Sequence, residues 1–176
     1  MMNAYFDAGP MKGHLDIEKA AVADAEEILA LQKVAYRSEA ELYNDYSIPP
    51  MVQTLDEIRS EFNRQRFLSL NSKNVGSLIL KAVIEGRIIG SVRAFSSGAT
   101  CFIGRLIVHP EFQDRGIGTL LMKEIEAQFK GCGRYELFTG MKSERNIRLY
   151  QKLGYRIFRD ERVNDRLTMV FMEKTT

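Results

Sequence analysis

The chain has 176 residues, of which 45% are hydrophobic and 27% are charged, a composition typical of one globular domain that buries its own core. Its 25 Lys and Arg residues nearly balance 23 Asp and Glu residues, so the formal net charge of +2 points neither to nucleic acid nor to a membrane surface as a partner. The two cysteines, Cys101 and Cys132, lack the spacing of a zinc site, and no apolar run approaches the roughly 18 residues of a membrane span, so we expect a cytoplasmic protein without a metal.

The N-terminal segment contrasts with the rest of the chain. Residues 1–14 contain three methionines, two glycines and a proline without periodicity, so we expect a flexible N-terminal tail. Residues 15–20 alternate between apolar and polar and predict a first strand, and a helix is expected over about 24–38. Residues 15–176 contain no linker or repeat and are expected to form a single domain.

Residues 39–53 are rich in tyrosine and acidic side chains and end at two prolines. This composition predicts a loop with a short helical piece, of the kind that lines sites for small polar ligands as well as plain surface. The sequence Thr54-Leu-Asp-Glu57 is a capping box, so a helix should begin there and last to about Arg66.

The sequence predicts strands in the centre of the chain. Three runs rich in β-forming residues, 78–84, 88–95 and 101–108, are joined by short polar turns and predict an antiparallel meander. An amphipathic helix then ends near Gly131. The short strand expected at 135–139 is reached through that helix, so it should lie parallel to the last strand of the meander.

The C-terminal part has one more helix and two strands. Ser143 can cap a helix whose inner face includes Tyr150, and Gly154 suits the position just after its end. Strands are expected at 155–158 and 167–172. The order β-α-α-βββ-α-β-α-ββ predicts a mixed α/β (α+β) domain.

A glycine loop lies between the third strand of the meander and the following helix. Gly116 and Gly118 stand where the apolar run has ended and the helix begins, and free N–H groups at a helix N-terminus can bind an anion. No Gly-Lys-Ser/Thr follows, which excludes a P-loop, and the third glycine of a dinucleotide fingerprint is missing. Glycine pairs also occur in such turns without any ligand, so the loop alone is compatible with an anion-binding site and with a turn that binds nothing.

A second motif adds to this loop. The sequence Gln113-Asp-Arg-Gly-Ile-Gly118 after a strand, and Leu149-Tyr-Gln-Lys-Leu-Gly-Tyr155 in the next helix but one, resemble the two motifs of the GNAT superfamily of acyl-CoA-dependent N-acetyltransferases. The resemblance implies the GNAT fold, a largely antiparallel sheet that is splayed in the middle and flanked by helices. It also implies acetyl-CoA as co-substrate. Relatives in this family are often dimers, but no feature of the sequence shows an interface, so a homodimer is one option and the oligomeric state stays open.

The resemblance assigns a set of residues to acetyl-CoA. The loop N–H groups would hold the pyrophosphate, and the strand before the loop would pair with the pantetheine arm. The cofactor-binding residues so implied are Leu106, Ile107, Val108, Gln113, Asp114, Arg115, Gly116, Ile117, Gly118, Thr119 and Asn146. Asn146 could equally face solvent, and the same holds for the basic side chains Lys142, Arg145 and Arg148, which could otherwise meet the 3′-phosphate of the cofactor.

Tyr150 stands at the family position of the general acid. Acetyl transfer expels a thiolate, and a thiol of pKa near 8.5 leaves more readily when a phenol of pKa near 10 donates a proton to it. By helical spacing alone Tyr150 could also be a core tyrosine. Neither cysteine stands beside a base in the motifs, so we expect direct attack by an amine in a ternary complex rather than a covalent acetyl-cysteine.

The acid that many members place before the splayed strand is absent, because Gly104 and Arg105 occupy those positions. An alkylamine of pKa near 10.4 still has to lose a proton, and the candidates to accept it are Glu136, His109, Asp45, Glu41 or water, of which we assign Glu136 as the second catalytic residue beside Tyr150. Arg105 would suit a carboxylate or phosphate on the acceptor, or it could be an outward charge.

The function so expected is acetyl transfer from acetyl-CoA to a primary amine of a small molecule, an amino acid derivative or a peptide, with the acceptor entering over residues 39–53. The missing acid leaves a non-catalytic CoA-binding sensor or partner-binding module of the same fold as the alternative. A nucleotide-binding regulatory domain without CoA is a further alternative, against which both missing nucleotide fingerprints argue.

Overall fold

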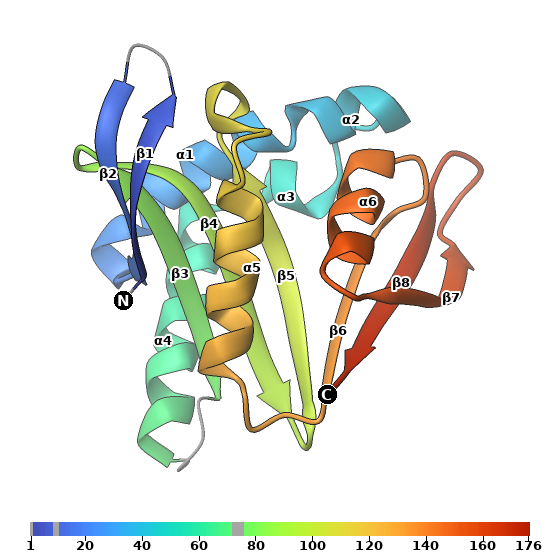
Figure 1. Ribbon diagram of the computed structural model, residues 1–176. Helices are drawn as coiled ribbons and strands as arrows, with labels where there is room; N and C mark the ends of the chain where they lie inside the picture. Colours follow the sequence, from blue (N-terminus) through green and yellow to red (C-terminus); the bar gives the residue numbers. More distant parts are fainter. Residues whose placement is uncertain (1, 9–10, 72–75) are drawn as a thin grey trace.

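The computed structural model describes residues 2–8, 11–71 and 76–176 (Figure 1). Within these residues, eight strands form one sheet in the order β1-β2-β3-β4-β5-β6-β8-β7. The strands are β1 (Met2–Ala8), β2 (Met11–Lys19), β3 (Ser77–Ile84), β4 (Arg87–Ser97), β5 (Thr100–Val108), β6 (Arg134–Gly140), β7 (Arg156–Arg162) and β8 (Thr168–Thr175). Neighbouring strands are antiparallel except β5 and β6, so the predicted mixed α/β class and the parallel placement of β6 are confirmed.

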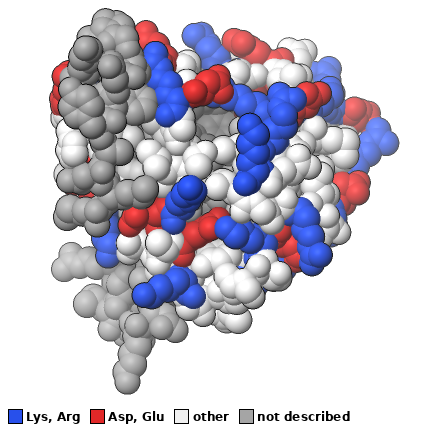
Figure 2. Space-filling model, in the orientation of Figure 1, with Lys and Arg blue, Asp and Glu red and all other residues white. Residues whose placement is uncertain are grey.

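The helices alternate with these strands along the chain. The α-helices are α1 (Ala25–Ala35), α2 (Arg37–Tyr43), α3 (Pro49–Val52), α4 (Leu55–Asn71), α5 (Ile117–Gln128) and α6 (Glu144–Lys152), and the 3₁₀ helices are η1 (Val22–Asp24) and η2 (Pro110–Phe112). Among the described helices, none combines the length and the apolar character that a membrane crossing requires. On the face shown in Figure 2, Lys and Arg side chains are interspersed with Asp and Glu.

The N-terminal segment differs from the expected tail over residues 1–14. Residues 2–8 form β1 and residues 11–19 form β2, and the two strands pair with each other, while residues 1, 9 and 10 lie outside the described part. Strand β2 also pairs with β3, where Leu15 lies opposite Ile84 and both are buried. The partner of β2 on its other side, β3, is far away in the sequence, so the pattern of residues 1–14 does not reveal this pairing.

The segment after the first helix is more helical than expected. The helix predicted over 24–38 is divided at Tyr36 into α1 and α2, and α2 continues into the predicted loop until Asn44, whose positive φ of 48° ends it. The capping box of α4 is confirmed, because the Thr54 N–H donates to the Glu57 carboxylate at 2.7 Å. Helix α4 continues to Asn71, beyond its predicted end.

Two cores lie on opposite faces of the sheet. On one face α5 and α6 cover a core that includes Leu80, Leu121 and Ile125, and on the other face α1 and α4 cover Ile28 and Ile58 (Figure 1). Successive residues of β3 face opposite cores, as the twofold period of a strand requires. The sheet between the two helical layers is therefore buried on both sides around β3, β4 and β5.

The sheet is splayed between β5 and β6. Their parallel ladder has three pairs, of which the last is Phe102 with Glu136. Beyond it β5 stays paired with β4 as far as Val108, β6 stays paired with β8 as far as Gly140, and the two strands diverge (Figure 1). Helix α2 reaches across the open end, where the Lys142 N–H donates to the Tyr43 hydroxyl at 2.8 Å. The predicted splay is confirmed, and it lies beneath α2.

Candidate active site

The glycine loop leaves backbone donors free at the start of α5. Gly116 has a positive φ of 82° and precedes the first helical residue, a conformation that glycine adopts without steric cost. The first helical hydrogen bond is donated by the Leu120 N–H to the Gly116 carbonyl at 3.0 Å. The N–H groups of residues 116–119 come before it and have no acceptor within the helix, so they can serve an anion.

The beginning of α5 lies where β5 and α6 meet. A Cβ atom on Gly118 would be 3.4 Å from Leu149 Cδ2 and 3.8 Å from Leu106 Cδ2, which are ordinary contact distances. Leu106 and Val108 pack against the core under α5 and α6, whereas Ile107 faces the core on the other side. The structure thus brings the predicted loop, the strand edge and the Leu149 motif together.

The loop side chains are used to hold the loop. Gln113 Nε2 donates to the Val108 carbonyl at 2.9 Å, and Gln113 Oε1 accepts a hydrogen bond from Arg145 of α6. Arg145 also forms an ion pair with Asp114 at 3.1 Å, and the Arg115 guanidinium lies 5.6 Å from the centre of the Phe112 ring. Arg145 therefore positions the loop, a role that sequence analysis did not assign to it.

Strand β5 contains a bulge at the splay. Ser91 pairs with Ile107 and Arg93 with Gly104, so β5 has one more residue than β4 between these pairs. Arg105 lies in this stretch with a positive φ of 50°. A bulge takes backbone groups out of the ladder and redirects side chains, and here the side chain of Arg105 lies over the Tyr36 ring.

Tyr150 is a buried phenol whose hydroxyl is unpaired. Its side chain is 7% exposed and its ring packs edge-on against Tyr155 at 6.1 Å between centroids, but its hydroxyl has no hydrogen-bond partner among the described residues. Burial raises the pKa of Tyr150, and the neighbouring Tyr36 and Glu39 raise it further. The hydroxyl therefore keeps its proton at neutral pH and is a donor without an acceptor.

Glu39 of α2 reaches α6 across the open end of the splay. Its Oε2 accepts a hydrogen bond from the Ser143 hydroxyl at 2.5 Å, and its Oε1 accepts one from Asn146 Nδ2 at 3.3 Å. The expectation that Ser143 caps α6 is wrong in this respect, because Ser143 holds the N-cap position but its hydroxyl is used by Glu39. Asn146 also donates to Thr139 Oγ1 at 3.4 Å, so its amide lies beside β6 rather than at the glycine loop.

Two arginines lie beside Tyr36. The Arg105 guanidinium carbon is 5.7 Å from the centre of the Tyr36 ring, and no described carboxylate forms an ion pair with it. Arg93 does form an ion pair, with Glu61 of α4. Burial lowers the pKa of Arg93 to about 10, with a further contribution from the charge of Arg105. The pair carries one positive charge more than its described partners neutralise.

The four predicted proton acceptors are not brought together with Tyr150. Glu136 is at the closed end of the splay and pairs with Arg134 at 2.8 Å, and it alternates along β6 with Tyr135 and Leu137, which face the core that contains Tyr150. Glu41 is exposed and lies 3.9 Å from Arg37. The structure therefore leaves the assignment of Glu136 without support from geometry.

His109 and Asp45 each have a local role. His109 Nδ1 accepts a hydrogen bond from the Glu111 N–H at 3.4 Å and caps η2. Asp45 accepts hydrogen bonds from the hydroxyl and the N–H of Ser47, and these bonds lower the pKa of Asp45. A carboxylate with a lowered pKa is a weaker base.

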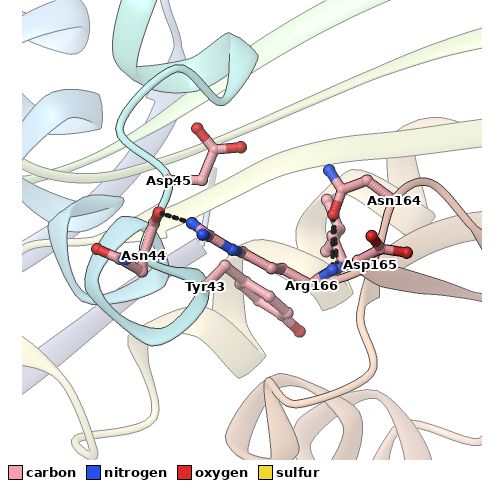
Figure 3. A pocket seen from close by; sticks show the side chains of 7 residues that line it. Tyr43, Asn44, Asp45, Asn164, Asp165 and Arg166 are labelled. Atoms are coloured by element: carbon pink, nitrogen blue, oxygen red, sulfur yellow. Dashed lines mark hydrogen bonds between the residues drawn. The ribbon is translucent and has the colours of Figure 1, made fainter.

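A shallow cleft adjoins the C-terminal end of α2. It has a volume of about 330 Å³ and is lined by Tyr43, Asn44, Asp45, Asn164, Asp165, Arg166 and Leu167 (Figure 3). The Arg166 side chain closes one side of it by donating to the Asn44 carbonyl at 3.2 Å. The predicted acceptor segment 39–53 therefore contributes a polar cleft, shared with the connection between β7 and β8.

Comparison with known proteins identifies a matching family and solved structures of similar fold. The model of the acetyltransferase (GNAT) family matches residues 36–155. The fold is similar to PaiA N-acetyltransferase from Thermoplasma acidophilum in complex with coenzyme A, at 19% identity and a TM-score of 0.74 over 92% of this chain and 99% of that one. It is also similar to yncA from Salmonella typhimurium with acetyl-CoA, at 18% identity and a TM-score of 0.71 over 92% and 93% of the two chains.

A third solved structure extends the comparison. The ribosomal-protein-S18-alanine N-acetyltransferase from Escherichia coli has 14% identity to this chain and a TM-score of 0.68, over 92% of this chain and 93% of that one. At such identities the likeness establishes a shared fold.

Proposed function

The chain belongs to the GNAT family of acetyltransferases, and from this premise we propose that it transfers the acetyl group of acetyl-CoA to a primary amine of a small molecule, an amino acid derivative or a peptide. One observation carries the proposal. Among the described residues, the loop N–H groups without an acceptor adjoin the splayed edge of β5 and α6, since a Cβ on Gly118 would contact both Leu106 and Leu149, and Tyr150, whose hydroxyl has no described partner, follows Leu149 on α6.

The residues around the splay fit acetyl-CoA. The N–H groups of residues 116–119 would hold its pyrophosphate, and the edge of β5 over residues 106–108 would pair with the amides of its pantetheine arm, since that edge has no strand partner beyond Phe102. Acetyl-CoA supplies an activated acetyl group as a thioester. Most of the loop side chains are engaged in holding the loop, so recognition here depends on the backbone.

Tyr150 is the proposed general acid. A thiolate that leaves as its carbon–sulfur bond breaks needs a proton, and the buried hydroxyl of Tyr150 has a proton to give and no other acceptor among the described residues. Burial, helped by Tyr36 and Glu39, raises the pKa of Tyr150, which keeps the donor protonated over the whole physiological range.

Direct attack by the amine is favoured over an acetyl-cysteine. Cys101 is fully buried at the closed end of the splay, opposite Tyr135, and burial raises the pKa of Cys101 to about 12. Burial also raises the pKa of Cys132. Neither thiol would be an effective nucleophile at neutral pH, because the reactive form is the thiolate.

Arg105 suggests an acidic group on the acceptor. Its guanidinium lies over Tyr36 at the open end of the splay and has no described carboxylate partner, whereas Arg93 beside it is paired. A carboxylate or phosphate on the acceptor amine would complete this pair of arginines with charge-assisted hydrogen bonds.

The test is release of CoA thiol in the presence of acetyl-CoA and a panel of alkylamines, free amino acids and short peptides. We expect thiol release that depends on the amine, with acidic amines among the better acceptors. A protein that binds acetyl-CoA but releases no thiol above background with any amine would instead be a CoA-binding module.

A further inference from the structure

We infer that Glu39 of α2 binds the acceptor ammonium and takes its proton, in the place of the acid that is missing from β5. The inference rests on the proposed acetyl transfer and assigns one of its steps to a residue. The carboxylate lies at the open end of the splay, bonded to Ser143 and Asn146 of α6, whereas Gly104 and Arg105 occupy β5.

The carboxylate of Glu39 has acceptor capacity to spare. Both of its described partners, the Ser143 hydroxyl and the Asn146 amide, are neutral, and no described Lys, Arg or His pairs with it. Each carboxylate oxygen can accept two hydrogen bonds, so each still has one position for an ammonium donor. A half-buried carboxylate whose charge is not neutralised is well suited to attract a cation.

The position of Glu39 relative to Tyr150 fits a reaction in which one residue accepts a proton from the amine and the other donates a proton to the thiolate. The charge of Glu39 contributes to the raised pKa of both Tyr36 and Tyr150, so the carboxylate lies near these two phenols. Asn146, which binds Glu39, lies one helical turn before Tyr150 on α6. An acceptor nitrogen bound by Glu39 would therefore lie on the same side of the splay as Tyr150, which is the proposed proton donor to the leaving sulfur.

The protons and bonds of the step balance. The acceptor ammonium gives one proton to the Glu39 carboxylate, and its nitrogen then forms a bond to the acetyl carbon while the carbon–sulfur bond breaks. The nitrogen loses a second proton as the amide forms, and the sulfur gains one from Tyr150, which is reprotonated by the second proton. Glu39 returns its proton to solvent, so one proton is released for each amide and thiol produced.

The charged and titratable groups around Glu39 come from four elements. Tyr36 lies between α1 and α2, Tyr150 lies on α6, and Arg105 and Arg93 lie beyond Tyr36 on β5 and β4. Burial lowers the pKa of Arg93 to about 10, so Arg93 is charged at neutral pH, and the phenols keep their protons there because burial raises the pKa of each. The acceptor amine, with an ordinary alkylamine pKa near 10.4, is the group whose protonation a pH series from neutral to alkaline changes.

The experiment compares Glu39→Gln with wild type by following kcat/KM for the best amine of the panel between pH 6.5 and pH 9.5. We expect Glu39→Gln to lose about 100-fold at pH 7, and the loss to shrink to about 10-fold or less at pH 9.5, because a growing fraction of the amine is then already deprotonated and needs no base. Glu144→Gln, which removes an exposed carboxylate from the first turn of α6, is the matched control and should stay within about 2-fold of wild type at every pH.

Three outcomes are distinguished by this design. A loss in Glu39→Gln that is the same at every pH would overturn the inference, because a residue that only ties α2 to α6 produces that result. Full activity in Glu39→Gln would also overturn it. The Kd for acetyl-CoA and the melting temperature of each variant show that the fold and the cofactor side are intact, and a wild-type protein that acetylates no amine would contradict the proposed function instead.

Discussion

The side of the site that faces α5 offers backbone groups to a ligand, whereas the side that faces α2 offers side chains. We call the first the cofactor side, made of the N–H groups of residues 116–119 and the edge of β5, and the second the acceptor side, made of Tyr36, Glu39, Arg105 and Tyr150. Backbone donors in a loop give the same interactions whatever the neighbouring side chains are. On the acceptor side, binding depends on the identity of each side chain, so substitutions there can change the substrate without changing the fold.

The largest expected effect is on the acceptor side. Tyr150→Phe should lower kcat about 100-fold while leaving the Kd for acetyl-CoA within about 2-fold, because it removes the proton donor and nothing that binds the cofactor. The melting temperature should not fall, since the lost hydroxyl has no hydrogen-bond partner among the described residues. Thiol release, calorimetry and thermal unfolding measure the three quantities, and a kcat equal to wild type would remove Tyr150 from the mechanism.

On the cofactor side we expect a substitution to raise the Kd for acetyl-CoA and to leave kcat nearly unchanged. Gly116→Val places a β-branched residue at a φ of 82°, which costs about 1–2 kcal/mol, and should weaken acetyl-CoA binding about 10-fold with little change in kcat at saturation. Gly118→Ala is the matched control, because its added Cβ meets ordinary contacts and should change the Kd less than 3-fold. An equal effect of both variants would mean that the conformation of the loop at Gly116 is not what binds the cofactor.

A smaller effect should separate acceptors from one another. Arg105→Gln removes a guanidinium that has no described carboxylate partner and should raise KM about 5-fold for an amine that carries a carboxylate, in keeping with one charge-assisted hydrogen bond at a half-buried site. The KM for the uncharged analogue of the same amine should not change. If KM rises equally for the acidic amine and its uncharged analogue, Arg105 affects the shape of the site and does not bind the carboxylate of the acceptor.

The smallest effect is expected outside both sides. The Thr54 N–H and hydroxyl donate to Glu57 and lower the pKa of that carboxyl. A pKa that is lower in the folded than in the unfolded protein stabilises the fold above the ordinary carboxyl pKa, and this stabilisation is lost as the pH falls through the folded value. Glu57→Gln should therefore be slightly less stable than wild type at pH 7 and equal to it in strong acid, as urea unfolding at several pH values would show, with kinetics unchanged.

The strand, loop and helix of the cofactor side could be predicted from the sequence because their signals are local, while the binding of acetyl-CoA to them stays a prediction. The end of β5, the glycine loop and the start of α5 follow one another within a short stretch, and each has its own pattern of apolar residues, glycines or helical spacing. The same holds for the meander and for the capping box of α4. In such segments the backbone conformation is decided largely by the residues that adopt it.

The acceptor side could not be predicted in this way. Glu39 and its partner Ser143 are 104 residues apart, and nothing near either residue indicates the other. The expected cap at Ser143 failed for that reason, since a tertiary partner took the hydroxyl that the local rule assigned to the helix. Strand β2 is similar, because its partner β3 follows only after helices α1 to α4 in the chain.

The most direct test of the proposed acetyl-CoA site, on which the proposed activity depends, is a calorimetric titration of acetyl-CoA into the wild-type protein and into Gly116→Val. We expect saturable binding at one site per chain that neither ATP nor NAD displaces, and a Kd about 10-fold higher in the variant. The absence of acetyl-CoA binding at millimolar concentration would contradict the account.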